Sequence, residues 1–134
     1  MSRKEHKYDE ENLEERNCFS KHNHILPESV EPDRAVFRME IWENSLNPYG
    51  FVHGGALYAL ADNACGYAAH TDGRNYVTLE GSLHFVSNRG KGTVLATAQV
   101  IHRGGTTCVV NADITDESGE MLATGQFTFF CIKT

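Results

Sequence analysis

One stretch of the sequence decides the fold: residues 54–70 read Gly-Gly-Ala-Leu-Tyr-Ala-Leu-Ala-Asp-Asn-Ala-Cys-Gly-Tyr-Ala-Ala-His. Alanine and leucine dominate this stretch, and both are strong helix formers. The helix that they predict is apolar on nearly every side, which is typical of a helix buried by the rest of its domain. Asp62 interrupts this apolar surface. We therefore expect one central, buried helix that carries a carboxylate.

Four segments after this helix, and one before it, read as strands because apolar and polar side chains alternate along them. Short turns that contain glycine separate the last four, as in β-hairpins. The predicted strands span residues 35–42, 76–86, 93–102, 106–115 and 122–132. Strict alternation in the second strand would divide its side chains between the two faces of the sheet: Val77, Leu79, Leu83 and Phe85 on one, and Thr78, Glu80, Ser82 and His84 on the other.

One buried helix and five antiparallel strands make an α+β domain in which the sheet wraps around the helix. A short helix is expected near residues 12–20, and Pro27 and Pro32 mark a connecting segment after it. Residues 1–16 are highly charged and form a predicted N-terminal extension, so the folded domain would span residues 17–134. A single helix covers one face of a sheet, so the other face and the sheet edges predict oligomerisation.

The composition bounds the class of protein. The chain has 134 residues, which suits one domain. Its formal net charge of -6 disfavours nucleic-acid binding, which needs a basic surface. No apolar run approaches the roughly 20 residues that cross a membrane, and the charged start does not resemble a signal peptide. We therefore expect a soluble, cytoplasmic protein with four free thiols, at Cys18, Cys65, Cys108 and Cys131.

The candidate chemistry lies just before the helix and in its first turn. Residues 47–55 read Asn-Pro-Tyr-Gly-Phe-Val-His-Gly-Gly. Gly54 and Gly55 would leave backbone N–H groups unshielded at the positive end of the helix dipole. Such groups could stabilise a carbonyl oxygen that gains negative charge. The same glycines could instead simply allow a tight junction between loop and helix.

Asp62 and His53 each have a structural and a functional interpretation. Partial burial would raise the basicity of the Asp62 carboxylate and suit it to act as a base or nucleophile. Asp62 could equally be a helix side chain that points to a wet edge. His53 is best explained as a capping or core histidine, and no second histidine or acid has metal-site spacing relative to it. Serine-nucleophile motifs of the GxSxG type are absent from the sequence.

The run from Asn47 to Asp62 closely resembles the hotdog-fold thioesterases of the phenylacetic-acid-degradation (PaaI) type. Their motif is Asn-x-x-Gly-x-x-His-Gly-Gly, followed by a helix that carries Asp. The resemblance extends from about Asn17 to the C-terminus and includes Val77-Thr-Leu-Glu80 with Ser82-Leu-His-Phe85. It implies a five-stranded sheet around one helix, coenzyme A (CoA) as the carrier of the acyl group, no metal or other cofactor, and dimers that usually pair into tetramers.

The resemblance also implies roles for individual residues. The Gly54 N–H and the Asn47 side chain would polarise the thioester carbonyl, Asp62 would activate water or attack directly, and Thr78 would help to hold the water. The predicted substrate-binding residues are His53, Gly55 and His84 near the acyl thioester, and Arg89, Lys91, Arg103 and Gly104 on turns that would meet the CoA phosphates. His84 stands where relatives often have Asn, so the acyl pocket could differ there. The three cations could instead be solvated hairpin charges.

The spacing of Gly54 and Asp62 predicts that two subunits share each site. Eight residues separate them on one helix, which is about 12 Å along the axis. A base must lie within about 2.6–3.2 Å of its water. Asp62 of the partner subunit could instead face Gly54 across a two-fold axis. Two other functions remain open, namely a non-catalytic acyl-CoA-binding hotdog module and a hotdog dehydratase that acts on hydroxyacyl thioesters.

Overall fold

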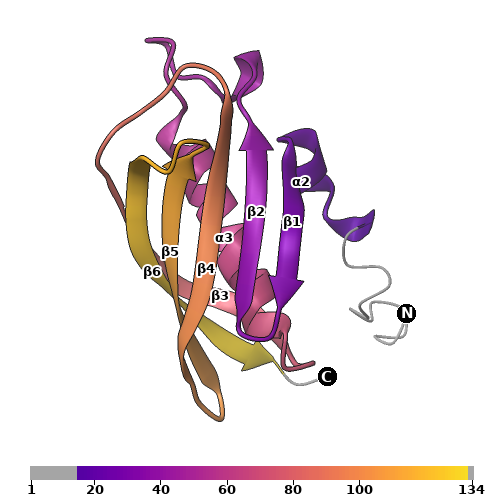
Figure 1. The fold of residues 1–134 in the computed structure, drawn as a ribbon. Helices are drawn as coiled ribbons and strands as arrows, with labels where there is room; N and C mark the ends of the chain where they lie inside the picture. Colours follow the sequence, from indigo (N-terminus) through magenta and orange to yellow (C-terminus); the bar gives the residue numbers. More distant parts are fainter. Residues whose placement is uncertain (1–14, 133–134) are drawn as a thin grey trace.

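The computed structural model describes residues 15–132, which form one six-stranded antiparallel sheet curled around a long helix (Figure 1). The strand order is β1-β2-β4-β5-β6-β3, so β1 and β3 are the edge strands. The elements in chain order are α2 (Cys18–His22), β1 (Ile25–Glu31), β2 (Arg34–Glu40), the 3-10 turn η2 (Glu43–Ser45), α3 (Gly54–His70), β3 (Asn75–Phe85), β4 (Thr93–Arg103), β5 (Thr107–Asp116) and β6 (Met121–Ile132). No helix in this part of the chain is long and apolar enough to cross a membrane.

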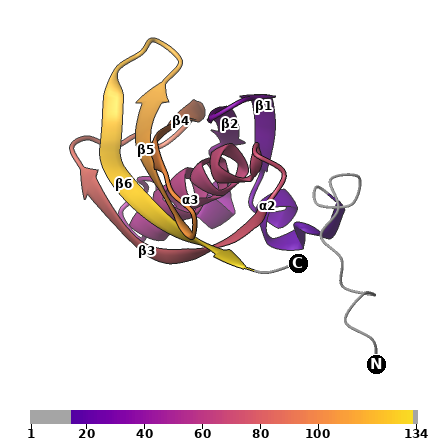
Figure 2. The same ribbon diagram turned by 90° about the horizontal axis from the view of Figure 1, so that it is seen from below.

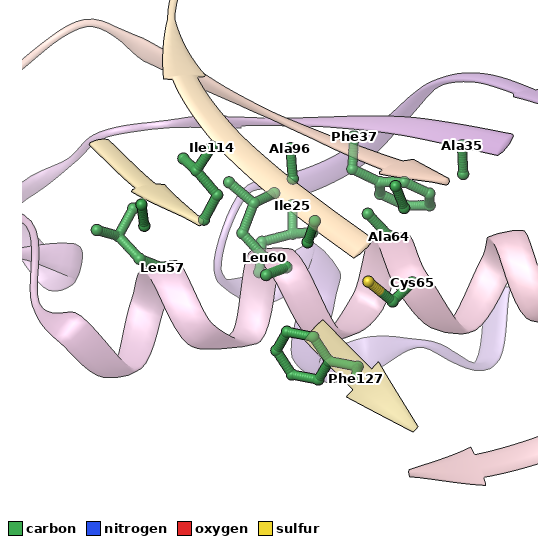
Figure 3. Close-up of a cluster of buried hydrophobic side chains, with 14 of the residues drawn as sticks. Ile25, Ala35, Phe37, Leu57, Leu60, Ala64, Cys65, Ala96, Ile114 and Phe127 are labelled. Atoms are coloured by element: carbon green, nitrogen blue, oxygen red, sulfur yellow. The ribbon is translucent and has the colours of Figure 1, made fainter. Parts of the chain in front are cut away.

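The central helix α3 begins and ends at the predicted residues. It lies in the concave side of the curled sheet (Figure 2), where it packs against β2, β3, β4 and β5. Leu57 and Leu60 of α3 share one buried cluster with Phe37, Ile114 and Phe127 of the sheet (Figure 3). Burial of each of these side chains contributes about 1.5–3 kcal/mol. The helix is therefore held by its fit to the sheet, which confirms the predicted α+β arrangement.

The sheet has six strands, so the predicted number of five is too low by one. The additional strand is β1, which lies in the segment predicted as a connection and pairs antiparallel with β2. Its side chains are exposed after Ile25, since the strand lies at the edge of the sheet. Pro27 has no backbone N–H, and it suits an edge strand because one side of such a strand has no neighbouring strand to hydrogen-bond. With one buried side chain and a proline, β1 lacks the alternation that identifies a strand.

Residues 15 and 16 are helical, and α2 follows from Cys18 after a break at Asn17, so the helix predicted near residues 12–20 is present in the described part of that range, whose first residues, 12–14, lie outside the described chain. Two hydrogen bonds link α2 and the residue before it to α3. Asn17 Nδ2 and Ser20 Oγ both donate to Asn63 Oδ1, at 2.9 and 3.0 Å. The predicted extension, residues 1–16, lies almost wholly outside the described residues.

A register shift in β3 breaks the alternation that the sequence predicts. Thr78 pairs with Phe129 of β6, but the next paired residue is Glu80, which leaves Leu79 as an extra residue. Thr78 therefore points towards α3, whereas Val77 and the extra residue Leu79 are exposed. The predicted common face for Val77, Leu79, Leu83 and Phe85 is wrong at its first two residues, because a bulge reverses the facing of the residues before it.

Candidate active site

The start of α3 presents one backbone donor. His53 caps the helix, and its Nδ1 accepts the Gly55 N–H at 2.9 Å. The neutral imidazole then carries its proton on Nε2. The Gly54 N–H has no acceptor in the part of the chain that the structure describes. Because it lies at the positive end of the helix dipole, it is suited to bind an oxygen that gains negative charge.

The Asn47 side chain holds the loop that leads into α3. Its Oδ1 accepts the N–H groups of Tyr49 and Phe51, at 2.9 and 3.1 Å. The turn closes when the Gly50 N–H donates to the Asn47 carbonyl at 3.0 Å, and Gly50 has a positive φ of 86°, which glycine adopts readily. With Oδ1 engaged in the loop, the side-chain NH₂ of Asn47 is the group left to donate to a ligand.

The carboxylate of Asp62 lies deeper along α3, and β3 supplies its partner. Thr78 Oγ1 donates to Asp62 Oδ1 at 2.7 Å. Burial raises the pKa of Asp62, and the hydrogen bond from Thr78 opposes part of that rise. The bulge at Leu79 is what directs Thr78 inward. Together these contacts give a fixed, partly buried carboxylate with raised basicity, which is what a general base requires.

Within one chain, Asp62 and Gly54 do not share a hollow. Asp62 opens into a cavity of about 460 Å³ between α3, β3 and β6. A second hollow of about 260 Å³ lies near the start of α3, and its lining includes the predicted residues His53 and Gly55 but neither Gly54 nor Asn47. The first turn and the middle of the helix thus carry complementary halves of a site, the first with donors and the second with a base.

His84 lies apart from both halves. It lines a polar hollow on the outer face of the sheet together with Ser82, Asn111 and Asp113. Thr124, which pairs with both His84 and Asp113 across the strands, donates to Asp113 Oδ1 at 2.7 Å. Within one chain, the predicted place of His84 at the acyl pocket is therefore not formed, since the intact sheet separates it from Asp62.

Both predicted phosphate-binding arginines, Arg89 and Arg103, form salt bridges with acidic side chains. Arg89 contacts Asp116 at 2.9 Å and Glu120 at 2.7 Å. Arg103 contacts Asp33 at 2.8 Å and Asp72 at 2.7 Å. Gly104, also predicted here, closes the β4–β5 turn by donating its N–H to the Thr107 carbonyl at 2.8 Å. Lys91 is exposed and has no ion pair within residues 15–132.

Replacing Arg103 by alanine is expected to destabilise the fold by about 1–3 kcal/mol, because it leaves buried acceptors without donors. Arg103 Nη1 donates to the Ala69 carbonyl at 2.9 Å and so joins the β4–β5 hairpin to the end of α3. The measurement is the free energy of unfolding in urea. Lys91→Ala is the matched control, and an equal, small effect of both substitutions would contradict this role.

The network around Arg103 should also make stability depend on pH. Burial alone would raise the pKa of Asp72, but hydrogen bonds from Tyr76 and Arg74 and the charge of Arg103 lower it to about 2. The ionised form therefore stabilises the fold above the ordinary pKa of about 3.9, and this contribution is lost as pH falls towards 2. We expect the difference in Tm between wild type and Asp72→Asn to shrink from pH 5 to pH 2.

The cavity beside Asp62 contains residues that the sequence did not single out. Gly66 and His70 follow Asp62 at intervals of four residues on the same side of α3, and Phe129 of β6 forms the opposite wall. Helical spacing from Asp62 was the available signal, since residues four apart lie on one face. The contribution of β6 has no such signal, because β6 lies far away in sequence.

Comparison with known proteins gives the family. The model of the thioesterase superfamily matches residues 49–123. The chain is 35% identical over 103 residues to 1,4-dihydroxy-2-naphthoyl-CoA hydrolase of Listeria monocytogenes serotype 1/2a (strain 10403S), which covers 75% of this chain and 84% of that protein.

Two solved structures show the same fold. The E. coli PaaI protein from the phenylacetic acid degradation operon has a TM-score of 0.88 at 29% identity, over 92% of this chain and 90% of that one. The protein smu.793 from Streptococcus mutans UA159, bound to acetyl CoA, has a TM-score of 0.78 at 30% identity, over 82% and 90% of the chains. The chain therefore belongs to the thioesterase superfamily, as a PaaI-like hotdog thioesterase.

Proposed function

We propose that this protein hydrolyses acyl-CoA thioesters to the free acid and CoA, at sites that two subunits share. The observation that carries the proposal is the pair of half-sites on α3: a Gly54 N–H without an acceptor among the described residues, and a partly buried Asp62 held by Thr78. The names of the relatives support the substrate class, since one is an acyl-CoA hydrolase and another structure holds acetyl CoA.

In the proposed mechanism, the Gly54 N–H and the Asn47 side-chain NH₂ donate to the thioester carbonyl oxygen. Asp62 of the partner subunit takes a proton from water as the water oxygen attacks the carbonyl carbon. The two donors stabilise the resulting oxyanion. The carbon–sulfur bond then breaks, and the CoA sulfur leaves with the proton returned from the carboxyl group. Direct attack by Asp62 remains the alternative first step. Both routes use protein groups and water, without a metal or other cofactor.

The course of α3 along β3 supports the sharing of each site. A Cβ on Gly54 would lie 3.5 Å from the Phe85 ring, at the last residue of β3, and Thr78, in the first half of the same strand, binds Asp62. A two-fold axis that brings Gly54 to Asp62 of the partner subunit must pass the helix midway, at Tyr58. The Tyr58 hydroxyl lies beside Gly81, 2.6 Å from the place of a Cβ, and Gly81 is close to the middle of β3.

The same axis therefore fits both the helix and the strand. On β3, the point midway between Phe85 and Thr78 lies next to Gly81. Gly81 is also the residue beside the Tyr58 hydroxyl, and Tyr58 is the midpoint on the helix. β3 is an edge strand, and its side away from β6 has no partner strand in the described part of the chain. We propose antiparallel pairing of β3 with β3 of a second copy, as the arrangement that completes two sites. Pairing of two such dimers into a tetramer is part of the same proposal.

The CoA phosphates need cations near the mouth of the site. Of the three predicted ones, Lys91 could bind a phosphate without first breaking a salt bridge. Arg89 and Arg103 would have to exchange carboxylates for phosphates. We therefore place Lys91 first among the candidate phosphate contacts.

Incubation with a panel of acyl-CoA thioesters and a thiol reagent tests the proposed function. Release of free thiol is the expected result. Binding of acyl-CoA without release would indicate a non-catalytic module, and loss of water from hydroxyacyl-CoA without thiol release would indicate a dehydratase. Either of these results would end the proposal.

Replacing Thr78 by valine should move the acid limb of the pH profile of kcat/KM to higher pH. The Thr78 hydrogen bond lowers the pKa of Asp62, so its loss raises that pKa further. The base is active when ionised, and activity then falls at a higher pH as the solution is acidified. Thr78→Ser keeps the hydroxyl and should keep the wild-type profile. An unchanged acid limb in the valine variant would show that Asp62 does not set it.

A further inference from the structure

The cavity beside Asp62 runs along one side of α3. Asp62, Gly66 and His70 succeed each other at intervals of four residues, so they line it lengthwise over about 12 Å. Tyr76, Val77 and Thr78 of β3 and Phe129 and Ile132 of β6 complete its wall. No lysine or arginine is among its lining residues. The cavity therefore suits an uncharged group that extends away from the carboxylate.

Gly66 stands in the middle of this wall and has no packing reason to be glycine. A Cβ there would meet the Phe129 ring at 3.5 and 3.9 Å, which is ordinary contact. Gly66 also has no positive φ. Glycine inside a helix is less favourable than alanine, since it loses more backbone freedom on folding. Gly81 differs, because a Cβ there would overlap Phe127 and the Tyr58 hydroxyl.

Glycine at position 66 thus leaves the volume of a methyl group unfilled in the cavity wall, beside the Phe129 ring, at some expense in helix stability. We propose that Gly66 is a specificity-determining residue, which keeps the cavity wide enough for an acyl group with a ring, a branch or several carbons. This inference rests on the proposed function, in which the thioester carbonyl lies at Asp62 and the acyl group extends past Gly66 towards His70. The CoA arm leaves in the opposite direction, because its phosphates need cations and this cavity has none.

Gly66→Ala and Gly66→Leu test the inference when kcat/KM is measured for acetyl-, hexanoyl- and phenylacetyl-CoA. We expect alanine to lower kcat/KM for the bulkiest acyl group accepted by wild type by about 10–200-fold, which is the usual effect of one methylene in a tight pocket. Hydrolysis of acetyl-CoA should change little. Leucine should extend the loss to the next smaller acyl group. Comparison of hexanoyl-CoA with phenylacetyl-CoA distinguishes an effect of acyl-chain length from an effect of ring width.

Thermal unfolding distinguishes a role in specificity from a purely structural role, because a structural defect would lower Tm and activity together. Gly66→Ala should raise Tm, because alanine favours the helix, while it lowers activity on bulky substrates. Gly105→Ala is the matched control, since Gly105 lies on the exposed β4–β5 turn and a Cβ there meets nothing within 4 Å. Its substrate profile should equal that of wild type.

Two results of the alanine variant would overturn the inference: an equal loss on acetyl- and bulky acyl-CoA, or an unchanged profile over the whole panel. Neither outcome touches the proposed function, which requires thiol release by wild type. If wild type releases no thiol from any acyl-CoA, the proposed function fails first. Should Gly66→Leu not fold, the smaller alanine variant still decides the question.

Discussion

Asp62→Asn is expected to lower kcat by about 10²–10⁴-fold, the usual cost of removing a general base. The substitution is nearly isosteric, and the amide oxygen can still accept the hydrogen bond from Thr78. Burial disfavours the ionised carboxylate of Asp62, as its raised pKa indicates. Removing that charge should therefore leave Tm unchanged or slightly higher. Steady-state kinetics and thermal unfolding of the same preparation provide the measurement.

Asp113→Asn is the control for this prediction, since Asp113 is an exposed carboxylate on the outer face of the sheet. It should retain wild-type kcat. A folded Asp62→Asn protein with wild-type kcat would remove Asp62 from the mechanism. Loss of activity together with a large fall in Tm would instead assign Asp62 a structural role.

Activity should reappear when two inactive variants, Asn47→Asp and Asp62→Asn, are unfolded together and refolded as a mixture. Asn47→Asp keeps the oxygen that accepts the Tyr49 and Phe51 N–H groups but removes the side-chain donor. In a mixed dimer one site carries both lesions and the other carries neither. Random reassembly with independent sites gives about a quarter of wild-type activity.

Mass labelling of one variant establishes whether mixed dimers form. Each variant refolded alone is the control and should stay inactive. Mixed dimers without activity would show that Asn47 and Asp62 of the same chain serve one site. That result would contradict the shared site and leave the family assignment intact.

The sequence predicts best those parts of the fold that depend on neighbours along the chain. The ends of α3 follow from its composition and from the capping His53, both of which are local. β1 was missed because an edge strand with Pro27 and one buried side chain carries little apolar pattern. The facing of Thr78 was also missed, since a bulge has no mark in the alternation of residues 76–86.

In the candidate site, too, the sequence predicts the local features and misses those that depend on tertiary contacts. The motif predicts Asn47, Gly54 and Asp62 as site residues, but not that Asn47 Oδ1 is engaged in holding its own loop. The ion pairs of Arg89 and Arg103 depend on acids that are 27 to 70 residues distant in the sequence. Such pairs arise from tertiary packing, so a cation on a turn cannot be assigned to phosphate from sequence alone.

The two edges of the sheet differ in a way that limits how many chains can add to it. A strand can extend a sheet when it offers a continuous row of N–H and C=O groups. β1 interrupts that row with Pro27 and carries the charges of Glu28 and Glu31, both of which discourage pairing. β3 has no proline. A two-fold contact between two β3 strands uses the pairing edge of both chains. The joined sheet therefore stops at two chains, and this protein cannot form an endless β-ribbon by that route.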